Sequence, residues 1–285
     1  MAALNNKIDF SVIITAKNAN PNGDPLNGNR PRENYDGYGE ISDVCIKRKI
    51  RNRLQDMGEK IFVQSDDRCD DGFKSLHDRA RGNEKLAELS KGKTTDPDKY
   101  AEAACKEWID VRSFGQVFAF KGDSVSVGVR GPVSVQSAMS VTPVVISSMQ
   151  ITKSVNGESG KESKASDTMG MKHRVDFAVY VFHGSINCQL AEKTGFTEED
   201  ADKIKEAIET LFENDCSSAR PEGSMEVRRV YWYKHDSKTP KYTSARVHRL
   251  LDVRLKDSID RPRSFEDYEI TLAQLDGLAP EVFEG

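Results

Sequence analysis

Three consecutive segments near the start of the chain restrict its fold more than any other feature: an alternating strand, a loop rich in turn-forming residues, and a cationic helix. From Lys7 to Ala16 apolar residues alternate with polar ones, which predicts a β-strand. Asn-Pro, Asn-Gly and Asp-Pro pairs crowd the next dozen residues and impose turns of defined shape. Ser42 or Asp43 then caps a helix with apolar residues at helical spacing from Ile46 to Met57.

The helix is strongly cationic, because five of the seven residues from Lys47 to Arg53 are Lys or Arg. Lys47 and Arg51 lie one turn apart beside the apolar stripe, next to Arg48. Such groups can follow a sugar-phosphate chain without reading its bases. A solvated helix face gives the same pattern, but the position after a shaped loop at a strand end favours an anion site.

The net charge of −4 hides a segregation of charge. Glu198 to Asp215 and Ser264 to Gly285 each carry −6, so the rest of the chain carries +8. Because the local field decides where an anion docks, the total charge does not exclude a nucleic-acid partner.

Length and composition indicate a folded intracellular protein. The 285 residues suffice for one elaborated domain or two small ones, and 37% are hydrophobic. The five cysteines are scattered without zinc-ligand spacing, so we expect reduced thiols and no metal. Neither a signal peptide nor a membrane-spanning run is present, which predicts a cytoplasmic protein without a membrane partner.

Further along, the pattern predicts two insertions around a central strand. Residues 58–110 are polar with short helical pieces and are taken as a helical insertion. The extended stretches around residues 144–174 enclose a Ser-, Gly- and Lys-rich segment at 156–167, which predicts a projecting hairpin with a mobile tip. Residues 175–187 are apolar on both faces, as in a central strand, and a capping box at Thr197 opens an amphipathic helix.

The remaining elements complete a fold prediction. Val111 to Gln136 suggests a strand, a kink and a second strand, and Glu226 to His235 and Val247 to Lys256 suggest two more strands. The order strand, helix, strand, strand, helix, strand, with long insertions, predicts an α+β protein with a split βαβ or ferredoxin-like topology.

Two further groups of residues are candidates for contact with a nucleic acid. Arg130, Gly131 and Gln136 suit a backbone contact, although an ordinary β-bulge explains them equally well. The hairpin carries apolar side chains able to wedge between bases or to pack against a neighbouring protein: Met149, Ile151, Met169 and Met171.

Catalytic patterns are poor. The five histidines form no metal-ligand pair, and no nucleophile elbow or phosphate-binding glycine loop is present. Asp24 and Asp43 could hold a metal, but aspartates at such positions more often cap turns and helices. Trp232 and Tyr233 imitate an RNA-stacking strand without its full motif and are expected in the core or on the sheet surface.

Several blocks of the sequence resemble a known family. N-A-N-P-N-G-D-P, R-P-R, S-D-V-C-I-K-R-K-I-R-N, V-R-S-F-G, V-R-G-P-V-S-V-Q, T-M-G-M-K-H and F-E-N-D-x-S-S-A-R-P-E-G resemble the type I-C CRISPR Cascade backbone subunit of the repeat-associated mysterious protein superfamily. The resemblance spans nearly the whole chain. It implies a modified RNA-recognition palm, helical fingers at residues 58–110 and a thumb hairpin at residues 144–174.

The resemblance also implies a function. The chain would be a non-enzymatic scaffold without cofactor that binds crRNA, meets target DNA through that guide, and contacts further copies of itself and other Cascade subunits. The alternative is a metal-dependent endoribonuclease acting through Asp24 or Asp43. The superfamily's glycine-rich C-terminal loop is missing, since this tail offers only Gly277 and Gly285, and the resemblance assigns guide processing to another subunit.

The resulting set of candidate residues is as follows. RNA contacts are expected from Asn20, Asn22, Arg30, Lys47, Arg48, Arg51, Arg130, Gln136, Lys172 and His173, and base-wedging contacts from Met149, Met169 and Met171.

Overall fold

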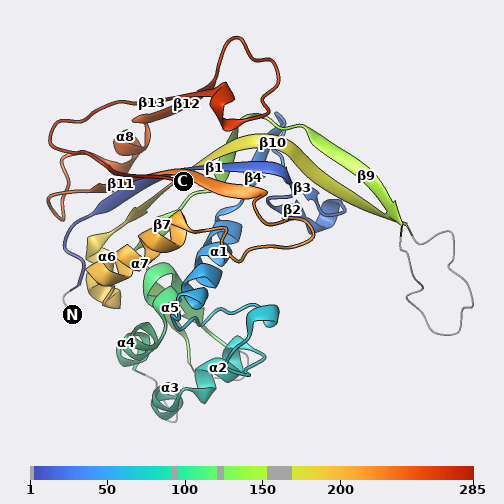
Figure 1. The fold of residues 1–285 in the computed structure, drawn as a ribbon. Helices are drawn as coiled ribbons and strands as arrows, with labels where there is room; N and C mark the ends of the chain where they lie inside the picture. Colours follow the sequence, from blue (N-terminus) through green and yellow to red (C-terminus); the bar gives the residue numbers. More distant parts are fainter. Residues whose placement is uncertain (1–2, 91–95, 121–124, 153–168) are drawn as a thin grey trace, which may run out of the picture.

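A computed structural model describes residues 3–90, 96–120, 125–152 and 169–285 (Figure 1). Its helices are α1 (Asp43–Asp56), α2 (Leu76–Gly82), α3 (Glu84–Leu89), α4 (Pro97–Glu107), α5 (Ile109–Phe114), α6 (Cys188–Thr194), α7 (Glu198–Glu209) and α8 (Ser244–His248). Its strands are β1 (Ile8–Ala19), β2 (Gly23–Asp24), β3 (Arg30–Pro31), β4 (Tyr38–Ile41), β5 (Gly115–Phe118), β6 (Val127–Arg130), β7 (Val133–Val135), β8 (Ala138–Pro143), β9 (Ile146–Thr152), β10 (Met169–Ile186), β11 (Met225–Lys234), β12 (Leu251–Leu255), β13 (Tyr268–Leu272) and β14 (Glu281–Glu284).

A large antiparallel sheet organises the molecule. Its strand order is β14-β11-β1-β10-β8-β4, and β7 and β9 also pair with β10. The expected first strand, central strand and Glu226–His235 strand are confirmed as β1, β10 and β11. β10 is longer than expected, because one continuous strand forms both the sheet centre and one arm of the projecting hairpin. The chain is therefore a mixed α/β protein built on an antiparallel sheet.

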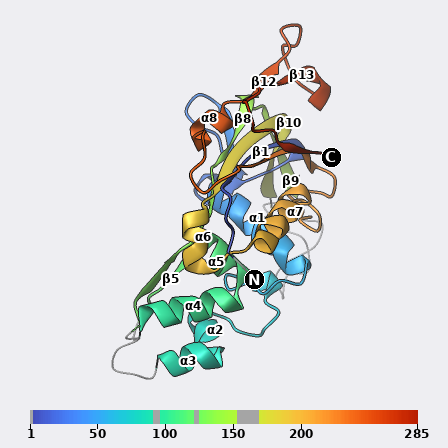
Figure 2. The same cartoon turned by 90° about the vertical axis from the view of Figure 1, so that its left-hand side faces the viewer.

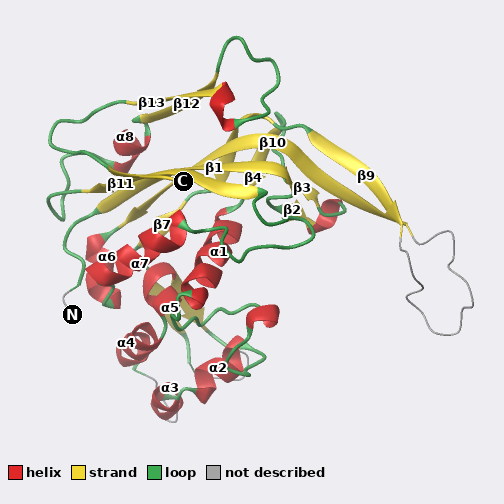
Figure 3. Cartoon of the chain, in the orientation of Figure 1, coloured by secondary structure: helices red, strands yellow, loops and turns green. Residues whose placement is uncertain are grey.

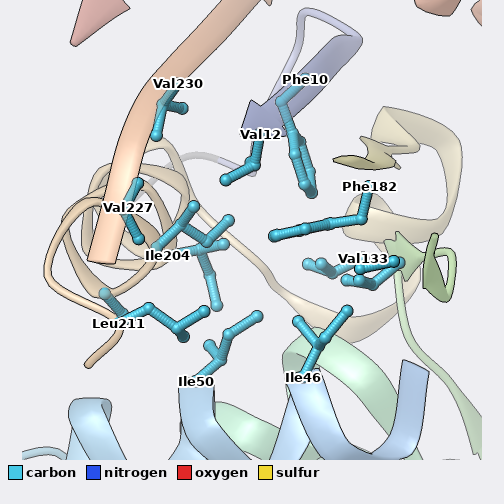
Figure 4. Packing of buried hydrophobic residues seen from close by; sticks show 14 of the residues in the cluster. Phe10, Val12, Ile46, Ile50, Val133, Phe182, Ile204, Leu211, Val227 and Val230 are labelled. Atoms are coloured by element: carbon cyan, nitrogen blue, oxygen red, sulfur yellow. The ribbon is translucent and has the colours of Figure 1, made fainter. Parts of the chain in front are cut away.

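Helices α1 and α7 cover one face of the sheet, which we call the helix side (Figures 1 and 3). Ser42 caps α1 by accepting a hydrogen bond from Cys45 N, and Thr197 forms the expected capping box of α7. Figure 4 shows Ile46 and Ile50 of α1 packed toward Phe182 of β10. These residues belong to one large buried cluster that joins both helices to the sheet.

The opposite face, which we call the back side, is covered as well. Residues of α8, β12 and β13 pack there on Val179, Tyr231 and Tyr233. The expected strand at Val247–Lys256 is only partly correct, since α8 continues to His248 and β12 pairs with β13 outside the main sheet. The two tyrosines are 3% and 1% exposed, respectively, so this face of the sheet is not open.

Described residues between Phe62 and Val129 build a second hydrophobic cluster below the helix side (Figure 2). The ring of Phe62 packs in tilted contact with those of Trp108 and Phe118, with ring centroids 4.7 and 5.0 Å away. Asp96 caps α4, one of the short helices expected in this region. The strand, kink and strand expected between Val111 and Gln136 appear as β6 and β7, but the first residues of that range form α5 and β5. β6 pairs with β5 and β7 pairs with β10, so the kink carries the chain from this cluster into the main sheet.

Two polar residues of β1 that point to the back side, Asp9 and Ser11, are buried and bond to His235 and His183, respectively. Asp9 is 0% exposed and accepts hydrogen bonds from Lys7 Nζ at 3.1 Å and from His235 Nε2 at 2.7 Å. Because an unpaired buried carboxylate costs several kcal/mol, these contacts tie the chain after β11 to the sheet.

Two stacked histidines lie beside this carboxylate. The rings of His183 and His248 are 4.8 Å apart, and Ser11 Oγ lies 2.8 Å from His183 Nδ1. His248 Nε2 donates to Gly184 O at 3.0 Å and lies 3.8 Å from Asp9 Oδ1. Burial, with a smaller contribution from His248, lowers the pKa of His183 to about 4.

All five cysteines are free thiols, as expected. No helix in the part of the chain that the structure describes is long and apolar enough to cross a membrane.

The histidine pair predicts a loss of stability in acid. Because the folded pKa of His183 is depressed, the unfolded chain binds the proton more tightly, and stability falls as the pH drops from about 6.5 toward 4. The loss attributable to this group is up to about 3 kcal/mol. Urea unfolding at a series of pH values should show a shallower acid slope for His183→Asn than for the parent. His173→Asn serves as the control, and an equal slope in all three proteins would contradict the assignment.

Candidate nucleic-acid interface

The loop after β1 is held in one shape by side-chain amides. Asn22 Oδ1 accepts from both the backbone N and the Oγ of Ser42, each at 3.0 Å, and so joins the loop to the start of α1. Asn20 is 3% exposed and donates from Nδ2 to Asn29 O at 2.6 Å. Both asparagines therefore shape the loop, and Asn22 is the more accessible of the two.

Two candidate cations of α1 lie near its surface. Lys47 forms an ion pair with Asp43 at 3.0 Å, one turn earlier on the helix, and its side chain is 24% exposed. Arg48 donates from Nη1 to Val63 O at 2.5 Å, and burial lowers its pKa. A pair such as Lys47–Asp43 contributes about 0.3–0.5 kcal/mol, so an incoming phosphate displaces it at little cost.

The other α1 cations are engaged more deeply. Arg51 Nε binds Asp110 Oδ2 at 3.0 Å, and its guanidinium carbon lies 4.8 Å from the centre of the Phe114 ring. Lys49 is 5% exposed and bonds to Asp215. The remaining one, Arg53, binds Glu213 at 2.9 Å and Thr210 Oγ1 at 2.7 Å.

Asp110 explains why Arg51 is held so firmly. Its carboxylate is 0% exposed and also accepts from Phe62 N at 2.7 Å and Val63 N at 3.0 Å. The same carboxylate thus fixes the second hydrophobic cluster onto α1. Arg51 is a predicted RNA contact. In the single chain described by the structure, its guanidinium instead neutralises the buried Asp110 carboxylate.

The loop and the projecting hairpin meet at a chain of polar contacts. Arg30 donates from Nη1 to Ser148 Oγ at 3.2 Å, and that oxygen lies 2.7 Å from His173 Nδ1. Arg30 also pairs with Glu33 at 3.8 Å. Two candidate residues separated by more than a hundred positions are thereby brought together.

The pairing of β9 with β10 divides the hairpin candidates between two faces. We call the paired residues 146–152 and 169–175 the arm. Met169, Met171 and His173 alternate with Lys172 along β10, and Lys172 pairs directly with Met149. Since directly opposed residues share a face and neighbours alternate, Met149 and Lys172 lie on the face opposite to the other three.

The two faces of the arm continue the two sides of the sheet. Val175, paired with Ile146, shares the face of His173 and belongs to the helix-side cluster. We therefore call the face of Met169, Met171, His173 and Ser148 the helix-side face of the arm, and that of Met149, Ile151 and Lys172 its reverse face. The predicted tip at 156–167 lies outside the described residues.

Arg130 and Gln136 are both exposed, at the end of β6 and just after β7. Between them, a Cβ at Gly131 would lie 2.3 Å from Ser113 O and 2.5 Å from Gly115 N. The close approach that this glycine permits is thus to the chain's own backbone, whereas the two flanking side chains remain available.

The carboxylates considered for metal binding have partners in the chain. Asp24 accepts from Leu26 N at 3.1 Å and faces Arg32 at 3.5 Å, while Asp43 faces Lys47. No cluster of three or more metal-ligating side chains occurs in residues 3–90, 96–120, 125–152 and 169–285. Trp232 and Tyr233 are buried, as expected, and Trp232 stacks on Phe10 with centroids 5.3 Å apart.

Comparison with known proteins assigns the chain to a family. The model of the family described as CRISPR-associated protein Cas7 matches residues 6–273. The chain belongs to the Cas7 family.

Two similar proteins add to this finding. A protein of Haloferax volcanii named CRISPR-associated protein Cas7 is 25% identical over 288 residues, which cover 95% of this chain and 82% of that protein. A chain of a CRISPR RNA-guided surveillance complex, pre-nicking, has a similar fold, with a TM-score of 0.51, 16% identity, and coverage of 85% of this chain and 79% of that one.

No pattern in the sequence indicates two of the contacts that position the candidate RNA-binding residues. Ser148 carries no motif, yet it links Arg30 to His173. Asp110 lies at the start of α5 and has no sequence pattern that relates it to Arg51. Only the tertiary structure reveals either link.

The different environments of the α1 cations predict different costs of removal. Arg51→Ala leaves the Asp110 carboxylate buried without its cation and should lower the free energy of unfolding by about 3 kcal/mol. Lys47→Ala removes an exposed pair within one helix and should change it by less than about 0.5 kcal/mol. Chemical denaturation of both variants measures the difference, and equal losses would contradict the structural role of Arg51.

Proposed function

We propose that this Cas7-family protein is a crRNA-binding backbone subunit of a CRISPR surveillance complex in the cytoplasm. The observation that carries the proposal is the family match across residues 6–273. The subunit holds the guide without cutting it, and base pairing of the guide reads the target DNA. The type I-C assignment of the complex rests on the sequence motifs in the loop and in α1.

The strand and helix order supports a modified RNA-recognition palm. β1, α1, β7, β10, α7 and β11 follow one another in the order of a split βαβ fold, with β10 and β11 on either side of β1. An ordinary RNA-recognition fold stacks bases on the open face of its sheet. Here that face is filled by α8, β12 and β13, so the guide has to lie elsewhere.

The helix side offers the alternative path. Arg30 and His173 meet at the base of the arm, and the same loop is joined to α1 near Lys47. Arg130, Gln136 and part of Arg48 add further polar surface from β6, β7 and α1. Cations and amides of this kind contact phosphate and ribose, and such contacts do not depend on the base sequence. Met169 and Met171 lie on the same face of the arm, and we assign to them the role of splaying a base aside.

Copies of the chain line up head to tail along the guide, together with other subunits of the complex. A heterologous contact that does not close a ring extends into a helical filament. A guide held by repeated, sequence-independent contacts leaves its base edges free for pairing, which is what the proposed role demands.

Salt dependence tests the proposed phosphate contacts. Each cation that contacts single-stranded RNA contributes about −0.7 to the slope of log affinity against log salt, so Lys47→Ala and Arg30→Ala should each flatten the slope by about 0.7. Affinity should hardly depend on RNA sequence. Arg254→Ala, on β12 of the back side and paired with Asp252 at 2.6 Å, serves as the matched control. Unchanged slopes in the first two variants would remove these residues from the interface.

Cleavage tests the absence of nuclease activity. Incubation of the guide-loaded complex with complementary labelled RNA and Mg²⁺ should leave the RNA intact, since Asp24 is held by Leu26 N and Arg32, and neither Asp24 nor Asp43 belongs to a cluster of three metal-ligating side chains in the described part of the chain. Cuts at regular intervals that disappear in Asp24→Asn or Asp43→Asn would establish the endoribonuclease instead.

A further inference from the structure

The connection from α7 to β11, orange in Figure 1, lies beside the loop after β1. Asn20 N donates to Ala219 O at 2.9 Å, and Lys17 N donates to Ser224 O at 2.8 Å. Because β1 lies between β10 and β11 in the sheet, this connection and the arm flank the loop on opposite sides. None of the RNA contacts predicted from the sequence comes from the connection, so one side of the loop has no assigned role.

Residues 217–220 of the connection form a tight turn. Ser217 N donates to Arg220 O at 2.8 Å, and Arg220 N donates to the backbone O and the Oγ of Ser217, each at 3.1 Å. Ser217 and Ser218 are both exposed. Because the Ser217 Oγ accepts its bond from the backbone, its own proton stays free to be donated to a ligand. The turn therefore presents hydroxyl donors at the surface beside the loop.

A shared carboxylate anchors the turn to α1. Asp215 pairs with Lys49 of α1 and with Arg220 Nε, the latter at 3.0 Å, so two cations share one anion. Lys49 is 5% exposed, whereas the side chain of Arg220 is 26% exposed. In the described part of the chain, neither terminal nitrogen of Arg220 donates a hydrogen bond. Arg220 is thus held by one nitrogen and keeps two donor groups for an acceptor outside the chain.

The surroundings of the turn carry a surplus of positive charge. Burial raises the pKa of the Cys45 thiol in the first turn of α1, and Lys49 and Arg220 lower it in part. Asp215 raises it again, and Arg32 of the loop lowers it. Three cations and one carboxylate therefore act on the same point. Such a balance attracts an anion to the junction of the loop, α1 and the connection.

We propose that Arg220, with the hydroxyl groups of Ser217 and Ser218, binds the phosphate backbone of the guide RNA where it passes the loop after β1 on the side of β11. The inference rests on the proposed function. It extends the interface from the arm, across the end of β1, to the connection before β11. The guide is then held on both sides of the loop.

The arrangement suits a phosphate in geometry and in charge. The two terminal nitrogens of a guanidinium match two oxygens of one phosphate, and the bond from Nε to Asp215 fixes their direction. Because the side chain is already held, it loses little freedom when the RNA binds. The buried Lys49 neutralises Asp215, so that carboxylate does not repel the incoming anion. A buried lysine thus supports a contact made by an accessible arginine.

Salt dependence tests the contact. With a poly-uridine RNA of about twelve nucleotides, Arg220→Ala should flatten the slope of log affinity against log salt by about 0.7, and Arg220→Lys should restore it. Arg228→Ala is the matched control, because its side chain is also 26% exposed and pairs with one carboxylate, Glu226, at 2.9 Å. Arg228 stacks on Phe265 of the back side, so its removal should leave the slope unchanged.

Two further measurements separate the contact from folding. Arg220→Ala leaves Asp215 paired with Lys49, so its melting temperature should stay within about 3 °C of the parent. Glu222→Gln removes an exposed negative charge next to the turn and should strengthen RNA binding by about twofold. An unchanged salt slope in Arg220→Ala, or weaker binding in Glu222→Gln, overturns the inference.

Photo-cross-linking tests the position without any substitution. Poly-uridine RNA that carries 4-thiouridine, irradiated on the unmodified chain, should cross-link to the peptide with residues 216–222 as well as to the loop after β1. Cross-links to the loop alone overturn the inference and leave the proposed guide binding intact. If the unmodified chain binds no RNA, the proposed function itself fails and this inference falls with it.

Discussion

Burial of the sheet on both faces is the constraint on which the rest of the structure depends. Every residue of β1 from Ile8 to Ala16 is buried, including Asp9 and Ser11. These polar groups are tolerable only because His235 and His183 meet them, so the chain after β11 has to close over the back of the sheet. With neither face of the sheet open, the proposed guide contacts lie on the loop after β1, on α1, around β6 and β7, and on the arm.

The same principle divides the cationic helix into two functions. A cation buried beside a core needs a carboxylate close by, and Lys49 and Arg51 have Asp215 and Asp110. The Lys49–Asp215 pair fixes the loop before β11 onto α1, and the Arg51–Asp110 pair fixes the second hydrophobic cluster onto it. Lys47 faces outward with only a weak partner on its own helix and keeps its charge available. Most of the five cations in this run therefore form ion pairs within the chain, and Lys47, near the loop, is partly exposed.

Local patterns in the sequence predicted the elements that carry them and little of how these elements meet. Alternation predicted β1, and the caps at Ser42 and Thr197 predicted where α1 and α7 begin, because both signals lie within a few residues. The back-side cover was missed, since the polar positions of β1 resemble a solvated face until their distant partners are known. Among the candidate residues, the grouping of Arg30 with His173 follows from tertiary hydrogen bonds, and the separation of Met149 from Met171 follows from strand register. Single-sequence patterns give neither.

Register also explains how a core determines the properties of a surface. β10 runs without interruption from Ile186 in the sheet to Met169 on the arm, so the arm extends the sheet. At its base Asn18 of β1 has a φ of 53°, and both Ala16 and Ala19 reach the helix-side cluster despite their odd spacing. That local break in alternation decides which side chains of the arm face α1. A shift of one residue in the pairing of β1 with β10 would exchange the two faces. The core prevents this shift, because the apolar side chains of both strands that face the helices are buried.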